Sequence, residues 1–126
     1  MASLTTIDGE QINFTPDAVA ALTDRAANGA LGTCVFGLAK AELRIAEPVG
    51  AFLTRLGITA HFVELTRPDE SPVWINAPAV SALSAPTPDQ YPANTNTVVS
   101  TGAFTQGVIE TPAVAIAAIN AHGGKL

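Results

Sequence analysis

Histidine and cysteine are the first side chains to consider for chemistry in this chain, because both bind metals and take part in catalysis. The chain has two histidines, His61 and His122, and one cysteine, Cys34. Neither histidine has a second ligand at a helical spacing such as His-x-x-x-His, so a metal site would need distant residues to converge. Cys34 stands in an apolar run and is expected to pack as a small hydrophobic residue.

Enzyme motifs are missing as well. No serine lies in a Gly-x-Ser-x-Gly sequence, which would expose it as a nucleophile. The segment Gly29-Ala30-Leu31-Gly32 has the wrong spacing for a phosphate-binding loop, and no lysine follows it. Asp8 and Asp69 could form a carboxylate pair, but aspartate is common in turns because it bonds its own backbone. We therefore expect no enzyme and predict no catalytic, cofactor-binding or metal-binding residues, and no cofactor.

The elements that would position such residues come in two similar copies. The run that begins at Leu4-Thr5 and ends at Ala21-Leu22 recurs 61 residues later, from Leu65-Thr66 to Ala82-Leu83. Further along, Thr33 and Val35 align with Thr97 and Val99, Ile45 with Ile109, and Pro48 with Pro112. A repeat of this length indicates a duplicated small domain rather than a solenoid. We expect one β-rich repeat at 1–59 and a second at 60–126, which can pack as a single domain.

Each copy has the pattern of a hairpin, a variable segment, two further strands and a C-terminal helix. The segment after the hairpin, around Ala18–Leu22 and Ala79–Leu83, is interpreted as a short helical turn that leads into a strand. Proline and glycine bracket the two predicted helices, at 49–56 and 113–121. The predicted fold class is α+β: two repeated antiparallel modules, each a curled sheet or half-barrel closed by its helix, which share one core.

The largest difference between the copies is the segment 84–96, which holds three prolines and no aliphatic side chain larger than alanine. We expect an exposed loop, and loops added to a scaffold often carry contacts with partners. Tyr91 has little core to join there, and aromatic residues are favoured at interfaces. The candidates for partner binding are Tyr91, Pro86, Pro88, Pro92 and Asn94.

Composition favours contact with protein. Charged residues make up 13% of the chain, about half of the usual ~25%, and the net charge is -5. An acidic chain without a basic stripe lacks the electrostatic footprint of a nucleic-acid-binding protein. The first residues show no signal peptide, and no apolar stretch approaches a membrane span. We expect no nucleic acid or membrane partner, and a chain that is soluble and cytoplasmic at synthesis.

The second copy resembles a known family. Phe62–Asp69, followed by Pro72–Asn76, is similar to the start of the FlbD-like proteins of flagellar and swarming bacteria, and Thr97–Val99 and Glu110–Pro112 resemble the remainder. Similar short sequences also occur in phage genomes. The resemblance covers about residues 62–121, and it implies a protein-binding module with no catalytic residues. The chain departs from the family by its duplication, its low charge and its proline loop.

These observations lead to a non-enzymatic assembly protein. Its most concrete form is a decoration (cement) protein of a virion capsid, which binds through strand edges, termini and the 84–96 loop, and which forms a homo-oligomer. Many modest contacts repeated over a symmetric lattice give high avidity. On this hypothesis the protein is associated with the virion. The alternatives are a FlbD-like accessory or regulatory module that binds one protein partner and, as the least favoured, a small RNA-binding regulator.

Overall fold

A computed structural model of the chain describes residues 2–27, 30–38, 42–102 and 104–126. Within these ranges the protein is a small α+β structure of ten strands in three antiparallel sheets, two α-helices and three short 3-10 helices. The elements follow in this order: β1 (Ala2–Thr5), β2 (Gln11–Phe14), η1 (Pro16–Ala18), β3 (Ala21–Ala27), β4 (Ala30–Phe36), β5 (Leu43–Ile45), α1 (Val49–Leu56), η2 (Thr59–His61), β6 (Phe62–Thr66), β7 (Pro72–Asn76), η3 (Ala77–Ala79), β8 (Val80–Ser84), β9 (Thr97–Thr101), β10 (Thr105–Val108) and α2 (Pro112–Ala121).

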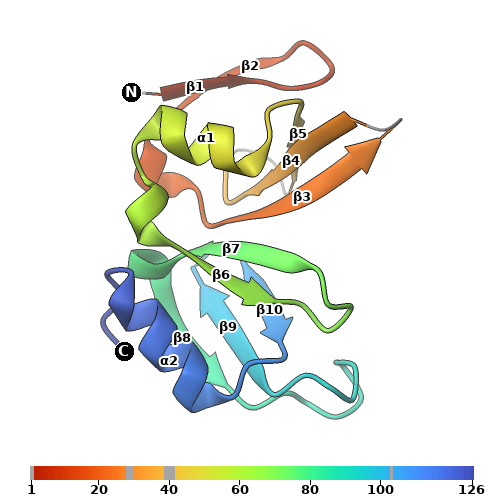
Figure 1. Ribbon diagram of the computed structural model, residues 1–126, viewed down its shortest axis with the longest axis vertical. Helices are drawn as coiled ribbons and strands as arrows, with labels where there is room; N and C mark the ends of the chain where they lie inside the picture. The colour runs from red at the N-terminus through yellow and green to blue at the C-terminus, as the bar shows by residue number, and fades with distance from the viewer. Residues whose placement is uncertain (1, 28–29, 39–41, 103) are drawn as a thin grey trace.

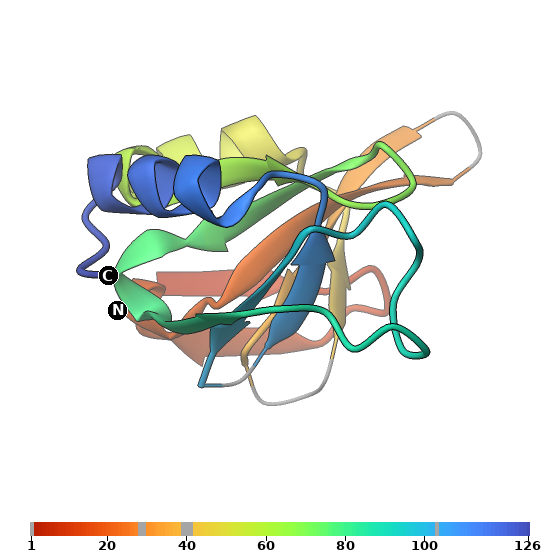
Figure 2. The ribbon, with the colours of Figure 1, turned by 90° about the horizontal axis from the view of Figure 1, so that it is seen from below.

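The central sheet contains strands from both halves of the chain. Its order is β5-β4-β3-β7-β6, so the three strands that precede residue 59 lie beside the two that follow it. The two halves meet where β3 pairs antiparallel with β7, a contact that we call the joint. It pairs Ala21 with Ile75, Leu22 with Trp74 and Thr23 with Val73. The hairpin β1-β2 and the sheet β10-β9-β8 stand apart from it, at opposite ends of the molecule (Figure 1). Both helices cover the same side of the sheets (Figure 2).

Turn chemistry explains the two hairpins. Gly9 has a φ of 90°, which suits the tight Asp8-Gly9 turn, and its N–H donates to the Thr6 carbonyl at 2.9 Å. The second hairpin turns at Pro68–Ser71, where the Arg67 N–H donates to the Ser71 carbonyl at 2.8 Å. Both hairpins were predicted from these residues.

The segment after each hairpin is the predicted short helical turn that leads into a strand: η1 precedes β3, and η3 precedes β8. The helical turns end earlier than the predicted Ala18–Leu22 and Ala79–Leu83, at Ala18 and Ala79. Alanine favours helix in isolation, but Ala21 pairs with strands on both sides and is fully buried. Packing between strands therefore overrides the local preference. Residues 39–41, between β4 and β5, and residue 103, between β9 and β10, lie outside the described residues.

The buried side chains form two clusters rather than the one shared core expected from the sequence. The first surrounds Phe52 of α1, and the second surrounds Ile119 of α2. Each takes side chains from the other half of the chain: Trp74 packs against the first cluster, and Ala21 belongs to the second. The joint between β3 and β7 therefore also links the two clusters. Among the described residues, no helix is long and apolar enough to cross a membrane.

Candidate interaction surfaces

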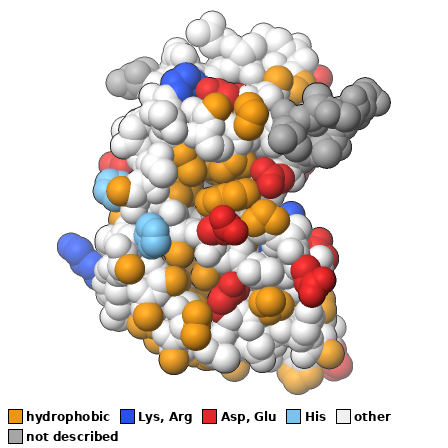
Figure 3. Space-filling model, in the orientation of Figure 1, with side chains coloured by type: hydrophobic (Ala, Val, Ile, Leu, Met, Phe, Trp, Pro, Cys, Tyr) orange, Lys and Arg blue, Asp and Glu red, His pale blue; other side chains and the backbone are white. Residues whose placement is uncertain are grey.

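The two helices flank a hollow of about 490 Å³ on their side of the molecule. We call it the interhelix groove. Figure 3 shows hydrophobic side chains over this middle region and over α2. The groove is lined by residues of α1, η2, β6, β7 and the end of α2: Val49, Gly50, Leu53, Thr59, Phe62, Val63, Glu64, Trp74, Ala118 and His122.

The exposed surface of α2 extends this apolar area. Val114 is 54% exposed and Ile116 is 37% exposed. Val114 precedes the groove residue Ala118 by four positions, so the two lie on the same side of the helix. Helix α2 carries no charged residue, whereas α1 exposes Thr54 and Arg55 on its outer face. An apolar helix exposed over much of its circumference is typical of a surface that a partner covers.

Local sequence fixes both helices. In α1, Pro48 stands at the N-cap, and Gly57 ends the helix with a left-handed φ of 71°. In α2, the Thr111 hydroxyl accepts a hydrogen bond from the Val114 N–H at 3.4 Å, and Pro112 occupies the first turn. The predicted helix limits were therefore correct to within one residue.

The proline loop between β8 and β9 is the second candidate surface. Four of the five residues predicted for partner binding, Pro86, Pro88, Tyr91 and Pro92, line a hollow of about 310 Å³. The fifth, Asn94, donates from its side chain to the Pro68 carbonyl at 2.7 Å and so ties the loop to the β6-β7 turn. Pro88, Pro92 and Asn94 are exposed, and Pro86 is half-buried.

Tyr91 is half-buried rather than free. Its ring lies over Gly107 of β10, where an added Cβ would come within 2.9 Å of the Tyr91 ring. The tyrosine therefore fastens the loop to its own sheet, and the exposed prolines are the part of the loop open to a partner. Sequence reasoning placed Tyr91 in an exposed loop but gave no sign of this contact, because Gly107 lies far along the chain.

A hollow of about 340 Å³ adjoins the same loop, between Tyr91, β10 and the β6-β7 turn. Arg67 lines it and has a buried Nε without a hydrogen-bond partner among the described residues. Asp69 lies in the same lining, and Ser71 donates to its carboxylate from both N–H and hydroxyl. These hydrogen bonds from Ser71, with the Arg67 charge nearby, lower the pKa of Asp69 below its ordinary value of 3.8.

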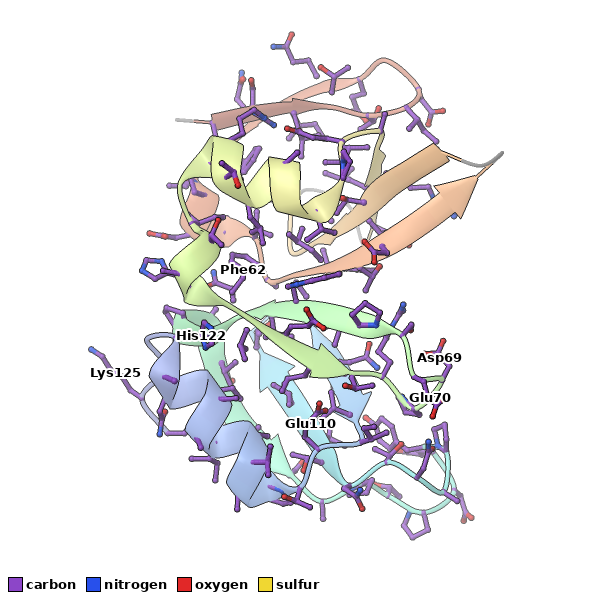
Figure 4. The ribbon with its side chains drawn as sticks, viewed as in Figure 1. Phe62, Asp69, Glu70, Glu110, His122 and Lys125 are labelled. Carbon is purple, nitrogen blue, oxygen red and sulfur yellow. The ribbon has the colours of Figure 1, made fainter. Side chains whose placement is uncertain are left out.

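The residues considered for chemistry are spread over the molecule. His61 is exposed in η2, while His122 lies at the end of α2 and contacts the Ala118 carbonyl through Nδ1 at 2.9 Å. Asp69 and Glu70 project from the β6-β7 turn, on the opposite side of the molecule from His122 (Figure 4). Cys34 is buried. Among the described residues, no group of three or more His, Cys, Asp or Glu side chains could hold a metal ion.

The interhelix groove was not predicted. Phe62 is buried, and Trp74 is partly exposed, packs against the first cluster and lines the hollow. The available signal was the composition of 112–121, which is apolar on every side of a helix. Comparisons of the chain with protein-family models, with curated proteins and with solved structures gave no match.

Proposed function

We propose that this chain is a non-enzymatic structural protein, built from a duplicated module, that binds in many copies to a large symmetric protein assembly. A virus capsid that it decorates is the most concrete case. The observation that carries the proposal is the apolar surface formed by the interhelix groove and the outer face of α2. A surface of this kind is suited to a protein partner.

Several features support the duplication. The order strand, strand, 3-10 helix, three strands, α-helix occurs twice along the chain. Helix η1 begins at Pro16 and η3 begins 61 residues later, at Ala77. The Thr33 hydroxyl donates to the Glu47 carbonyl at 2.6 Å, and the Thr97 hydroxyl donates to the Glu110 carbonyl at 2.8 Å.

The strand registers adjust one detail of the repeat. Ile45 pairs with Thr33, whereas the partner of Thr97 is Val108. Under the proposed duplication, this register favours Val108 rather than Ile109 as the counterpart of Ile45.

The difference between the two helices indicates which copy meets the partner. In the first copy, Arg55 of α1 forms an ion pair with Glu47 at 2.9 Å and stacks over Phe52 at 5.5 Å, so its outer face is polar. The second copy has no such pair on α2 and exposes Val114 and Ile116 instead. Of the two helices, α2 therefore has the more apolar exposed surface. We assign this surface to the capsid contact.

The test is sedimentation of the purified chain with the particle fraction from its source. Val114→Lys places a charge on the exposed face of α2 at a site where lysine is a good helix former, so the fold is expected to persist. Thr54→Lys makes the matched change on the exposed face of α1. The proposal predicts that the wild type and Thr54→Lys sediment with the particles and that Val114→Lys stays in the supernatant. Equal sedimentation of the two variants would contradict it.

If instead the chain ignores particles and captures one soluble partner at a one-to-one ratio, it acts as an accessory module of the FlbD-like kind.

A further inference from the structure

The joint between β3 and β7 shows how one copy of the module binds the next. Strand β7 of the second hairpin adds to the free side of the sheet β5-β4-β3. Three residue pairs lie opposite one another, and the Asn76 N–H donates to the Ala20 carbonyl at 3.0 Å. The two halves are therefore connected by strand addition as well as by the chain itself.

The same two binding edges occur once more, without partners. In the repeat, β2 is the equivalent of β7, and β8 is the equivalent of β3. Among the described strands, β2 is paired only with β1, and β8 is paired only with β9. Each therefore presents one edge whose counterpart in the other copy is used in the joint.

Residues of the paired edges, on β3 and β7, are more deeply buried than their equivalents on the unpaired edges of β8 and β2. A missing partner strand would cause this difference. Ala21 and Leu22 of β3 are 0% exposed, whereas their equivalents Ala82 and Leu83 are exposed and half-exposed. On the other side of the joint, Val73 of β7 is 0% exposed and its equivalent Ile12 is half-exposed.

Neither edge strand carries a charge or a proline that would oppose strand addition, although both strands are short and the register of β8 on β9 shifts between Val80 and Ala82. Soluble proteins commonly place lysine, proline or an inward-pointing charge on exposed edges. Strand β2 reads Gln-Ile-Asn-Phe and β8 reads Val-Ser-Ala-Leu-Ser, without a charge or a proline. Both strands are neutral, so no repulsion opposes their approach.

The placement of the edges determines the kind of contact. The β1-β2 hairpin lies at one end of the long axis and the β8-β9-β10 sheet lies in the other half (Figure 1), while both helices lie on the same side (Figure 2). The second module thus follows the first head to tail. A contact that repeats this relation between chains joins two different surfaces, and it gives a closed ring or a filament.

We infer that β8 of one chain pairs antiparallel with β2 of the next copy, and that this strand addition assembles the protein head to tail. The inference deepens the proposed assembly function and rests on the duplication proposed with it. The β3-β7 register transfers directly: Ala82 lies opposite Phe14 of the next copy, Leu83 opposite its Asn13, and Ser84 opposite its Ile12. The result is a second five-stranded sheet, β10-β9-β8-β2-β1, across the boundary between chains.

Cysteine trapping tests the contact and its direction. Buried Cys34 is replaced by alanine throughout, and Asn13→Cys and Leu83→Cys are made in separate chains. Residues directly opposite on antiparallel strands have Cα atoms about 4.5–5.5 Å apart, which lies within the range of about 4.4–6.8 Å found in disulfides. We expect a cross-linked dimer only when the two variants are mixed, and a ladder when one chain carries both. A Gln11→Cys chain is the register control and is expected to cross-link poorly with Leu83→Cys.

A charge on the edge tests the same contact without a cross-link. Ala82→Lys alters an exposed residue of the single chain but would bury its charge in the joint, as Ala21 is buried. Thr105→Lys puts the same charge on exposed β10. Sedimentation equilibrium is expected to give masses well above that of one chain for the wild type and Thr105→Lys, and the monomer mass for Ala82→Lys, with all three chains folded.

Two results would overturn the inference. One is a wild-type chain that stays monomeric at every concentration, and the other is a disulfide formed by Asn13→Cys alone, which would indicate a twofold contact. Particle binding is measured separately. A monomer that sediments with particles removes the head-to-tail contact and leaves the decoration function, whereas an oligomer that ignores particles does the reverse.

Discussion

At the scale of single residues, Gly107 supports the proline loop because it leaves room for Tyr91. An added Cβ would lie 2.9 Å from Thr95 Cγ2 and from the Tyr91 ring. Gly107→Ala must therefore displace the loop, and we expect it to lower the free energy of unfolding by about 1–3 kcal/mol. Urea unfolding measures this change, and near-ultraviolet circular dichroism reports on Tyr91, which is the only tyrosine.

Gly50 provides the matched control. It lies in α1, and an added Cβ would meet nothing within 4 Å. Gly50→Ala is expected to raise stability by about 0.5–1 kcal/mol, since alanine loses less backbone entropy in a helix. Changes of the same sign in the two variants would argue against a packed tyrosine.

Cys34 gives a prediction for pH. Burial raises the pKa of its thiol above the ordinary value of 9.0, and a hydrogen bond with Glu42 acts in the same direction. The folded thiol keeps its proton to higher pH than the unfolded one. Its contribution to stability is therefore complete below about pH 9 and is lost as the pH rises through the folded pKa.

The measurement is urea unfolding of the wild type and of Cys34→Ala from neutral to alkaline pH. The wild type should lose more stability than Cys34→Ala above about pH 9. Parallel curves for the two proteins would contradict the assignment of this loss to Cys34.

The residues show what could be predicted of the candidate surfaces. The composition of 84–96 predicted a polar loop, and four of its five candidates do line one hollow. The contacts of Tyr91 with Gly107 and of Asn94 with Pro68 could not be predicted, because each joins residues separated by a folded sheet or hairpin. Local composition predicts exposure, but it does not determine which distant backbone a side chain meets.

At the scale of elements, the glutamates that precede the two helices, Glu47 and Glu110, have different roles. The Glu110 carboxylate accepts hydrogen bonds from the Thr66 N–H at 3.0 Å and from its hydroxyl at 2.9 Å, and so holds β6 to the start of α2 (Figure 4). Glu47 pairs with Arg55, whose side chain is 42% exposed. The first contact joins two elements, and the second is a surface ion pair.

Alanine at each position should separate these roles. Glu110→Ala leaves the Thr66 N–H without its acceptor and is expected to cost about 1–3 kcal/mol of unfolding free energy. Glu47→Ala is expected to cost about 0–1 kcal/mol, and less in high salt. Thermal and urea unfolding of both variants measure the difference. A larger cost for Glu47→Ala would contradict this account.

Elements also show which parts of the fold the sequence could reveal. Helices α1 and α2 were predictable because proline and glycine mark their ends in the residues themselves. The strands after the helical turns were predicted only without their limits, because Ala20-Ala21-Leu22 at the start of β3 favours helix locally and only pairing makes it extended. The sequence predicted one shared core; instead there are two clusters, although Trp74 and Ala21 each pack in the cluster of the other half.

At the scale of the whole molecule, the chain combines a surface with few charged residues, an apolar helix face and, among the described strands, two unpaired strand edges. Each feature alone is common, but they lie on different parts of one small protein. The strand edges, at different ends of the chain, suit contacts between copies, and the α2 side suits contact with a larger surface. A head-to-tail array of chains would present α2 at regular intervals, which multiplies weak contacts into high avidity.

The most direct test of this account is the number of chains bound to each particle at saturation, measured by sedimentation of the purified protein with the particle fraction. We predict saturable binding at a fixed number of chains per particle, a number that matches the symmetry of the particle. A chain that remains in the supernatant at every concentration, or that binds without saturation, would contradict the account.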